Sequence, residues 1–222
     1  MKISKEVLDF LVDLDQNNNR EWFNERKPIF KGHQEVVKSF FSAVQTRLEE
    51  TDQIESHNIF RIYRDVRFSK DKSPFKSRFA GGFKRATSAL RGGYYLNIEP
   101  GKSMAGGGFF APNSEDLKRI RQEFEQDDTE IRAIINNETF KSFFGELQGD
   151  GVKSAPRGFD PSHPAIDLIR KKQFYVIRSF TDKEVTQPDF IEKVIETYMA
   201  IRPYFDYMSA VLTSNADGES LI

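Results

Sequence analysis

The chain has 222 residues, enough for one domain with a full hydrophobic core, and we expect a single domain over residues 1–222. It contains no cysteine, which excludes disulfides, thiolate zinc sites and a cysteine nucleophile and favours a reducing, cytoplasmic setting. No window approaches the roughly 20 apolar residues of a membrane span, so the sequence predicts a soluble protein that does not enter a membrane.

The first fifty residues have helical periodicity. Ser4 can cap a first helix, after which apolar residues recur at helical spacing until the polar break Asn17–Asn19. A short second helix should carry Trp22 and Phe23. The strongest periodic pattern in the chain follows, with apolar residues at intervals of three and four, and predicts a long helix from Ile29 to Leu48.

The period then changes to two. Alternation from Ile59 to Phe68 predicts a strand, with Arg64 on the apolar face between Ile62 and Val66. Such an arginine needs acceptors for five donors, supplied either by a carboxylate such as Glu99 or by a bound anion.

The next strands are expected to form a hairpin. Alternation over residues 94–98 and the turn residues Pro100-Gly101 predict a strand that returns through Gly106–Gly108. Glycines in a strand more often reflect close packing or a bulge than ligand binding.

The rest of the chain is mostly helical. Helices are expected from Ser114, around residues 131–135 and 140–144, near residues 165–170 and after the capping-box pattern Thr181–Glu184, with a strand at Phe174–Phe180 and a last helix that Pro203 breaks or kinks. This order predicts an α+β fold, a single domain with a mainly antiparallel sheet flanked by helices.

Positive charge is concentrated in one segment. From Arg61 to Arg91 the chain has ten Lys or Arg against Asp65 and Asp71, a net charge of +8, whereas the whole chain carries −1 and the remainder therefore −9. A cationic segment in an acidic body indicates internal neutralisation or a local anion site, while a general nucleic-acid binder usually carries an excess of positive charge over its whole domain.

We therefore interpret the arginine-rich segment as a binding site for a small anion, most simply a phosphorylated ligand. The expected ligand-binding residues are Arg61, Arg64, Asp65, Arg67 and Lys72, in which Asp65 orients the neighbouring arginines. No pattern assigns a reaction, a catalytic residue or a cofactor. Two alternatives stay open: a module for RNA or single-stranded nucleic acid, and a non-enzymatic protein that binds a partner and whose motif is a structural charge network.

Other motifs have ordinary explanations. Gly101-Lys102-Ser103 is not a P-loop, because Leu96 stands where that loop requires glycine. The three histidines are dispersed without ligand spacing, so the sequence predicts no metal site built from them. Asp71 precedes Ser73-Pro74 and is better suited to organising a turn than to acting as a base.

The arginine-rich segment also resembles a known family. Its spacing is similar to a signature Arg-x-x-Arg-Asp-x-Arg-Phe, two residues, Asp or Asn, Lys, two residues, Tyr, found in the bacterial family called domain of unknown function 2461. The residues that carry the resemblance are Arg61, Arg64, Asp65, Arg67, Phe68, Asp71 and Lys72, with Phe75 at the tyrosine position, and further similar segments are 17–23, 93–95, 98–101, 106–108, 156–160 and 163–165. The resemblance implies one fold unit over nearly the whole chain and implies no activity.

Overall fold

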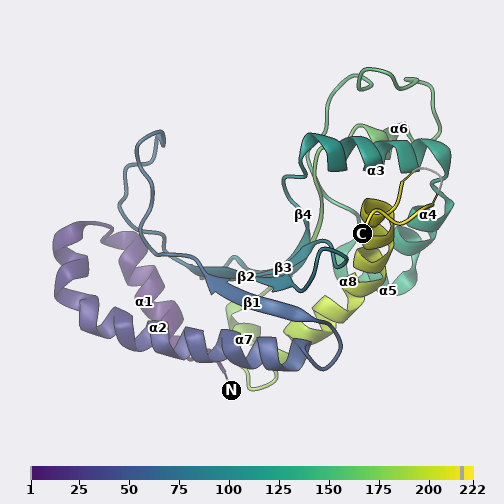
Figure 1. Ribbon diagram of the computed structural model, residues 1–222. Helices are drawn as coiled ribbons and strands as arrows, with labels where there is room; N and C mark the ends of the chain where they lie inside the picture. The colour runs from purple at the N-terminus through teal and green to yellow at the C-terminus, as the bar shows by residue number, and fades with distance from the viewer. Residues whose placement is uncertain (1, 216–217) are drawn as a thin grey trace. The chain divides into compact units, whose positions relative to one another are not determined.

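The computed structural model describes residues 2–215 and 218–222, and the fold is α+β, with an antiparallel sheet packed against helices (Figure 1). The strands are β1 Ile54–Ile59, β2 Phe79–Arg85, β3 Gly93–Ile98, β4 Ser103–Phe109 and β5 Phe174–Phe180, which neighbour one another in that order. The helices are α1 Lys5–Gln16, α2 Arg20–Leu48, α3 Ser114–Gln126, α4 Thr129–Asn136, α5 Glu138–Phe144, α6 Ile166–Ile169, α7 Asp182–Val185 and α8 Phe190–Thr213. The predicted fold class is confirmed.

The residues group into two compact units. The first unit comprises the chain up to Phe83 together with Tyr95–Ala105 and Ser179–Glu196, and the second comprises Lys84–Tyr94, Gly106–Arg178 and Thr197–Ile222. This grouping rests on contacts between residues and does not show whether the units fold independently. The single domain expected over residues 1–222 therefore stays a prediction.

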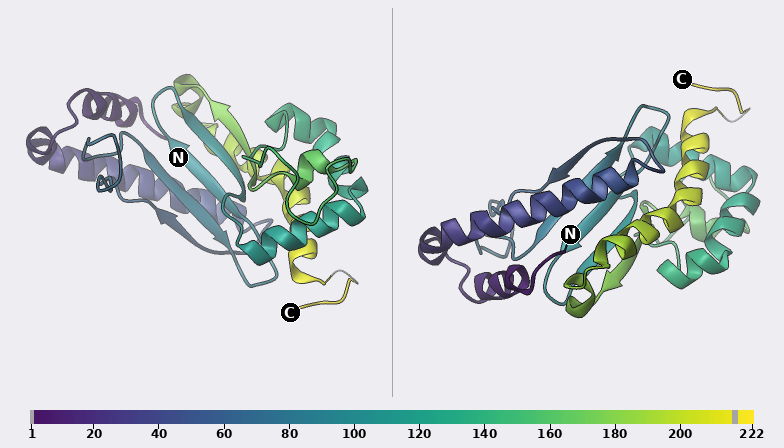
Figure 2. Two further views of the ribbon diagram at one scale, coloured as in Figure 1. Left: turned by 90° about the horizontal axis from the view of Figure 1, so that it is seen from above. Right: turned by 90° about the horizontal axis from the view of Figure 1, so that it is seen from below.

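In the first unit α2 runs along β1 and α1 lies beside α2 (Figure 2). The apolar stripe of α2 meets the sheet through aromatic rings: Phe30 stacks on Phe79 at 5.7 Å between ring centroids, and Phe41 on Phe83 at 5.4 Å. Gly81 in β2 has no space for a side chain, because a Cβ there would collide with the Asn58 carbonyl. The core of this unit is therefore built from phenylalanine rings pressed closely against the sheet.

The second unit has its own aromatic core. Tyr94 of β3 contacts Phe205 of α8 at 5.0 Å between centroids. A Cβ on Gly107 of β4 would lie 2.8 Å from the same Phe205 ring and 2.8 Å from the Gly93 carbonyl oxygen. Close packing thus explains this glycine, as the ordinary interpretation of a strand glycine expects.

Two expected breaks in the helices do not occur. The predicted short helix around Trp22 and the long helix after it are one helix, α2, with Pro28 inside it. Phe23 and Phe30 on either side of the proline are both buried and lie 5.2 Å apart between centroids, so their packing offsets the cost of the missing backbone hydrogen bond. At Pro203 a break or a kink was expected; α8 continues past this residue without a break, and the kink stays a prediction.

Several local predictions are confirmed. The first helix starts after Ser4 as expected, β3 and β4 form the predicted hairpin around Gly101 at φ +69°, and β5 has the predicted limits. Thr181 makes the predicted capping box with Glu184. No helix within residues 2–215 and 218–222 has the length and apolar character that crossing a membrane requires.

Candidate functional site

The arginine-rich segment is a loop, and the strand predicted from Ile59 to Phe68 is wrong. β1 ends at Ile59 and β2 begins at Phe79, so residues 60–78 leave the sheet as a two-armed loop, here called the arginine-rich loop (Figure 1). The arms pair near their base, where Arg64 N donates to Pro74 O at 2.9 Å and Lys76 N donates to Ile62 O at 2.7 Å. The alternating pattern does not form a strand here, because the second arm turns back and Phe75 packs on Phe23 of α2.

A buried ring anchors this loop to the helices. Phe75 is only 2% exposed and stacks on Phe23 of α2 with 4.0 Å between centroids. Asn18, in the short link between α1 and α2, donates its Nδ2 to Phe75 O at 3.0 Å and accepts from Phe75 N at 3.1 Å. The side chain of Phe75 and its backbone are thus both held, which fixes the position of the residues that follow.

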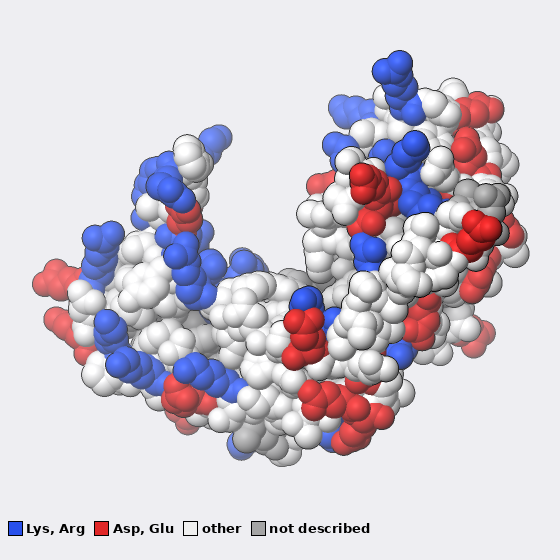
Figure 3. Space-filling view, in the orientation of Figure 1, with Lys and Arg blue, Asp and Glu red and all other residues white. Residues whose placement is uncertain are grey.

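The outer part of the loop is exposed and basic, and Lys and Arg side chains cover much of its surface (Figure 3). Arg67 forms a bidentate ion pair with Asp65: Nε donates to Oδ1 at 3.0 Å and Nη2 donates to Oδ2 at 2.7 Å. Lys72 Nζ donates to Val66 O at 2.9 Å. Phe68 was expected on the apolar face of a strand, but it is 97% exposed. The expected pairing of Asp65 with Arg67 is therefore present, on the loop.

Arg64 is half-buried, with 32% of its side chain exposed, and its partner is a loop carboxylate. Its Nη1 lies 2.6 Å from Asp71 Oδ2, while Glu99, suggested as a partner, pairs with other residues. Asp71 also accepts from the backbone N and the Oγ of Ser73 at 2.9 and 2.6 Å, so it organises the turn as predicted. These bonds hold the pKa of Asp71 below its usual value, and Arg64 lowers it further.

One donor of Arg64 remains unused. Its Nε is shielded from solvent and has no hydrogen-bond partner in the part of the chain that the structure describes. A buried N–H of this kind is costly unless a further group accepts it.

A cavity of about 290 Å³ lies beside this arginine. It is lined by Arg64, Lys76, Ser77, Arg78 and Glu99, and we call it the basic cavity. Three cations and one carboxylate face it, so its charge is positive. Arg64, Lys76 and Arg78 come from the two arms of the arginine-rich loop, and Glu99 follows β3.

Glu99 is held in place by its neighbours. Asn97 Nδ2 donates to Glu99 Oε2 at 3.1 Å, and Arg78 Nη1 and Lys102 Nζ lie 3.7 and 3.9 Å from its carboxylate oxygens. The carboxylate is mostly buried, with 20% of its side chain exposed. It is therefore shared between two cations and neutralises neither fully.

The pKa of Lys76 is lowered by burial and also by the positive charges around the cavity. Burial lowers the pKa of its ammonium group, and the nearby Arg78, Arg61 and Arg64 lower it further by repulsion. Arg61 thus acts on the cavity through its charge although it does not line it. The electrostatic effect is that of a site where positive charge exceeds negative charge.

Of the residues predicted from the sequence, only Arg64 lines the basic cavity, and Arg61 lies near enough to affect Lys76. On the outer loop Asp65 pairs with Arg67, and Lys72 bonds the carbonyl of Val66. Lys76, Ser77 and Arg78 were not predicted as site residues. They lie in the same basic stretch, and only the folding back of the second arm brings them beside Arg64.

The described residues contain neither a cluster of histidines nor another group of side chains placed to hold a metal ion. His33 contacts the Phe10 ring at 5.2 Å between centroids and is partly buried, as expected for a packed histidine, and burial lowers its pKa. Among the described residues there is no group of three or more His, Cys, Asp or Glu side chains placed to hold a metal ion.

The fold and site together define an α+β protein with a basic cavity at the base of an arginine-rich loop. No curated protein and no solved structure matches the chain. The family described as conserved hypothetical protein (DUF2461) matches residues 6–207, and the chain belongs to this family. The resemblance seen in the sequence is confirmed, and it extends over nearly the whole chain.

Proposed function

We propose that the protein binds a small anionic ligand, most simply a phosphorylated compound, in the basic cavity. The observation that carries this proposal is the cavity itself, in which Arg64, Lys76 and Arg78 surround a space of about 290 Å³. Glu99 is the carboxylate that lines it, and Asp71 pairs with Arg64 without lining it, so two carboxylates face three cations. A phosphate group offers several acceptor oxygens and two negative charges near neutral pH, which suits guanidinium donors.

The charges around the cavity support the same ligand. An anion in the cavity would lie beside the side chains of Arg64, Lys76 and Arg78, which line it. It would also offset the repulsion that lowers the pKa of Lys76. Ligand binding is then expected to raise that pKa and to favour the charged ammonium form.

The remaining predicted residues have supporting roles in this proposal. Arg61 adds positive potential close to the cavity, and Arg67 and Lys72 attract the anion toward the loop. Asp65 fixes Arg67, as the hydrogen bonds between them suggest. The lack of cysteine remains our reason to expect that this occurs in a reducing, cytoplasmic compartment.

Single-stranded nucleic acid is a second candidate, favoured by one observation. Phe68 is almost fully exposed, Tyr63 is about half exposed, and both lie on the loop that carries the cations. Exposed rings between phosphate-binding cations are typical of sites where bases stack. The acidic remainder of the chain disfavours this candidate, and the cavity supports the small ligand over a purely structural charge network.

The test is a thermal unfolding series with inorganic phosphate and with a short single-stranded oligonucleotide. At about 100 times its dissociation constant, a bound ligand should stabilise the fold by roughly 2.7 kcal/mol. We expect phosphate to raise the melting temperature of the native protein, and Arg64→Ala and Arg78→Ala to remove most of this increase.

Lys31→Ala is the matched control, since it removes an exposed cation of α2 outside the cavity. A phosphate response that is equal in all three variants would contradict the proposed site. Stabilisation by the oligonucleotide alone, lost in Phe68→Ala, would favour the nucleic-acid candidate instead.

A further inference from the structure

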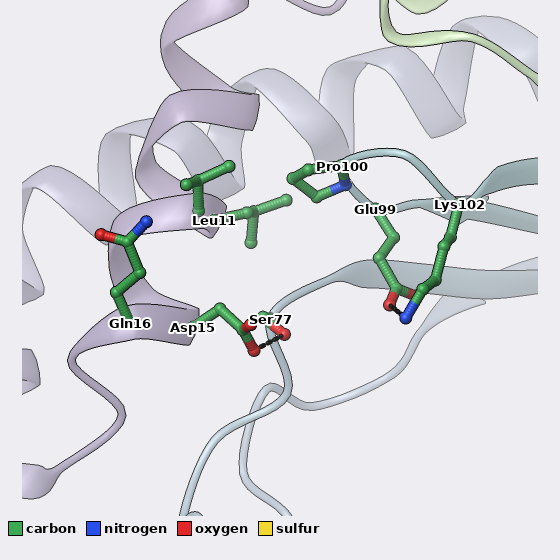
Figure 4. A pocket seen from close by; sticks show the side chains of 8 residues that line it. Leu11, Asp15, Gln16, Ser77, Glu99, Pro100 and Lys102 are labelled. Carbon is green, nitrogen blue, oxygen red and sulfur yellow. Dashed lines mark hydrogen bonds and ion pairs between the residues drawn. The ribbon is translucent and has the colours of Figure 1, made fainter.

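A second cavity of different character borders the basic cavity. The second cavity has a volume of about 220 Å³ and shares Ser77 and Glu99 with the first. Its other side is formed by the last turns of α1, and its end by the turn after β3, as the close-up shows (Figure 4). We call it the acceptor cavity, and all of its lining lies within the first unit.

The polar groups of the acceptor cavity are mainly hydrogen-bond acceptors. Asp15 and Gln16 of α1 line it together with Glu99. Lys102 lines it as well and lies 3.9 Å from Glu99, so two carboxylates border this space with one cation to balance them. Leu11 and Pro100 add apolar surface. A second anionic group would be repelled here, whereas hydroxyl groups could donate to the carboxylates and the ring face of a sugar could contact the apolar surface.

Both carboxylates are held in place by neighbouring side chains. Ser77 Oγ donates to Asp15 Oδ1 at 2.8 Å, which leaves Asp15 Oδ2 available to a ligand donor (Figure 4). Glu99 is fixed by Asn97 and lies 3.7 Å from Arg78. The acceptors are thus positioned before a ligand arrives, which lowers the entropic cost of binding.

The lining also distinguishes among phosphorylated compounds. None of the described residues that line the acceptor cavity is aromatic, so there is no ring on which a nucleobase could stack. A volume of about 220 Å³ suits a group the size of one sugar ring, and the two cavities together come within the usual range for small-molecule sites.

We propose that the ligand is a phosphate monoester of a polyhydroxylated compound, that is, a sugar phosphate with one phosphate group. The phosphate occupies the basic cavity, and the hydroxyl groups donate to Asp15 and Glu99 in the acceptor cavity. This inference rests on the function proposed above and adds the class of ligand. A sugar with a second phosphate is rejected, because the carboxylates of the acceptor cavity would face it.

The experiment is isothermal titration of the whole protein with inorganic phosphate, glucose 6-phosphate and fructose 1,6-bisphosphate. Glucose 6-phosphate should bind at least about tenfold more tightly than inorganic phosphate, the factor that one added charge-assisted hydrogen bond supplies. Fructose 1,6-bisphosphate should bind more weakly than glucose 6-phosphate.

Two variants separate the two cavities. Asp15→Ala should reduce the affinity for glucose 6-phosphate to that for inorganic phosphate while leaving phosphate binding within about twofold, because only the acceptor cavity changes. Gln16→Ala should also reduce the preference for glucose 6-phosphate over inorganic phosphate, and it leaves the hydrogen bond between Ser77 and Asp15 in place. Asp13→Ala, an exposed carboxylate on the same helix, is the control and should leave all three affinities unchanged.

The outcomes distinguish this inference from the proposed function. The native protein could bind phosphate without any preference for glucose 6-phosphate, or Asp15→Ala and Gln16→Ala could lower both affinities equally. Either result would contradict the inference that the ligand is a sugar phosphate, while the proposed anion site would stand. If neither phosphate nor glucose 6-phosphate binds to the native protein, the proposed function fails and this inference fails with it.

Discussion

Asn18 and the backbone of Phe75 form a reciprocal pair of hydrogen bonds, with the Asn18 amide as donor to the carbonyl at 3.0 Å and as acceptor from the N–H at 3.1 Å. The two residues are 57 positions apart, and both lie in segments that resemble the family. The pair joins the link between α1 and α2 to the second arm of the arginine-rich loop. The positions of Lys76, Ser77 and Arg78, which follow directly, depend on this connection.

Replacing Asn18 with alanine should therefore affect both stability and binding. Two hydrogen bonds at about 1 kcal/mol each predict a loss of about 2 kcal/mol in the free energy of unfolding, measured by urea denaturation. Anion affinity should fall as well, because the second arm loses its support. Asn17→Ala is the matched control, since its side chain bonds only Asp13 O within the described residues. Equal effects of the two substitutions would contradict this role of Asn18.

Two phenylalanines of the loop, Phe75 and Phe68, should differ sharply in their contribution to stability. Phe75→Ala removes a buried ring stacked on Phe23 and should cost about 3–5 kcal/mol of stability. Phe68→Ala removes a ring that is exposed and should change stability by less than about 0.5 kcal/mol. Thermal or urea unfolding of both variants measures the difference. A large loss for Phe68→Ala would mean that the loop packs against the protein in solution.

His33 predicts a pH dependence of stability. Burial lowers its pKa in the folded protein from the ordinary value of 6.5, so the unfolded chain binds a proton more readily. Its contribution to stability is therefore complete above pH 6.5 and decreases as the pH falls from 6.5 toward the lowered pKa. In His33→Gln the difference in the free energy of unfolding between pH 7 and pH 5 should be smaller than in the native protein, by urea denaturation at each pH. An unchanged difference would show that His33 is solvated.

Arg85 should be the more sensitive of two arginines compared by substitution. Its side chain is fully buried in the second unit, where it donates to Arg91 O at 2.9 Å and pairs with Asp206 at 3.2 Å. Arg85→Ala removes a fully buried side chain together with its hydrogen bond to the Arg91 carbonyl, and should cost about 3–5 kcal/mol through the cavity and the lost bond. Arg67→Ala, at an exposed pair on the loop, should leave the urea midpoint nearly unchanged. Similar midpoints for the two variants would contradict the burial of Arg85.

Local sequence patterns specify several elements of this protein. The start and apolar spacing of α1, the turn at Gly101, the limits of β5 and the capping box at Thr181 all follow from interactions between residues close in sequence. These were predictable because hydrogen bonds and side-chain contacts within one turn or one strand decide them. Within the described residues, the Ser4 side chain makes no capping hydrogen bond at the start of α1. The concentration of positive charge between Arg61 and Arg91, which led to the candidate site, could also be read from the order of residues in the sequence.

Tertiary packing decides the rest. Pro28 does not end α2, because Phe23 and Phe30 on either side of it are buried together, and the alternation after Ile59 does not form a strand. The basic cavity exists because Phe75 inserts against Phe23 and turns the second arm back beside Arg64. Such contacts join residues far apart in the chain, and their free energy depends on surface buried between distant elements, which no local pattern records.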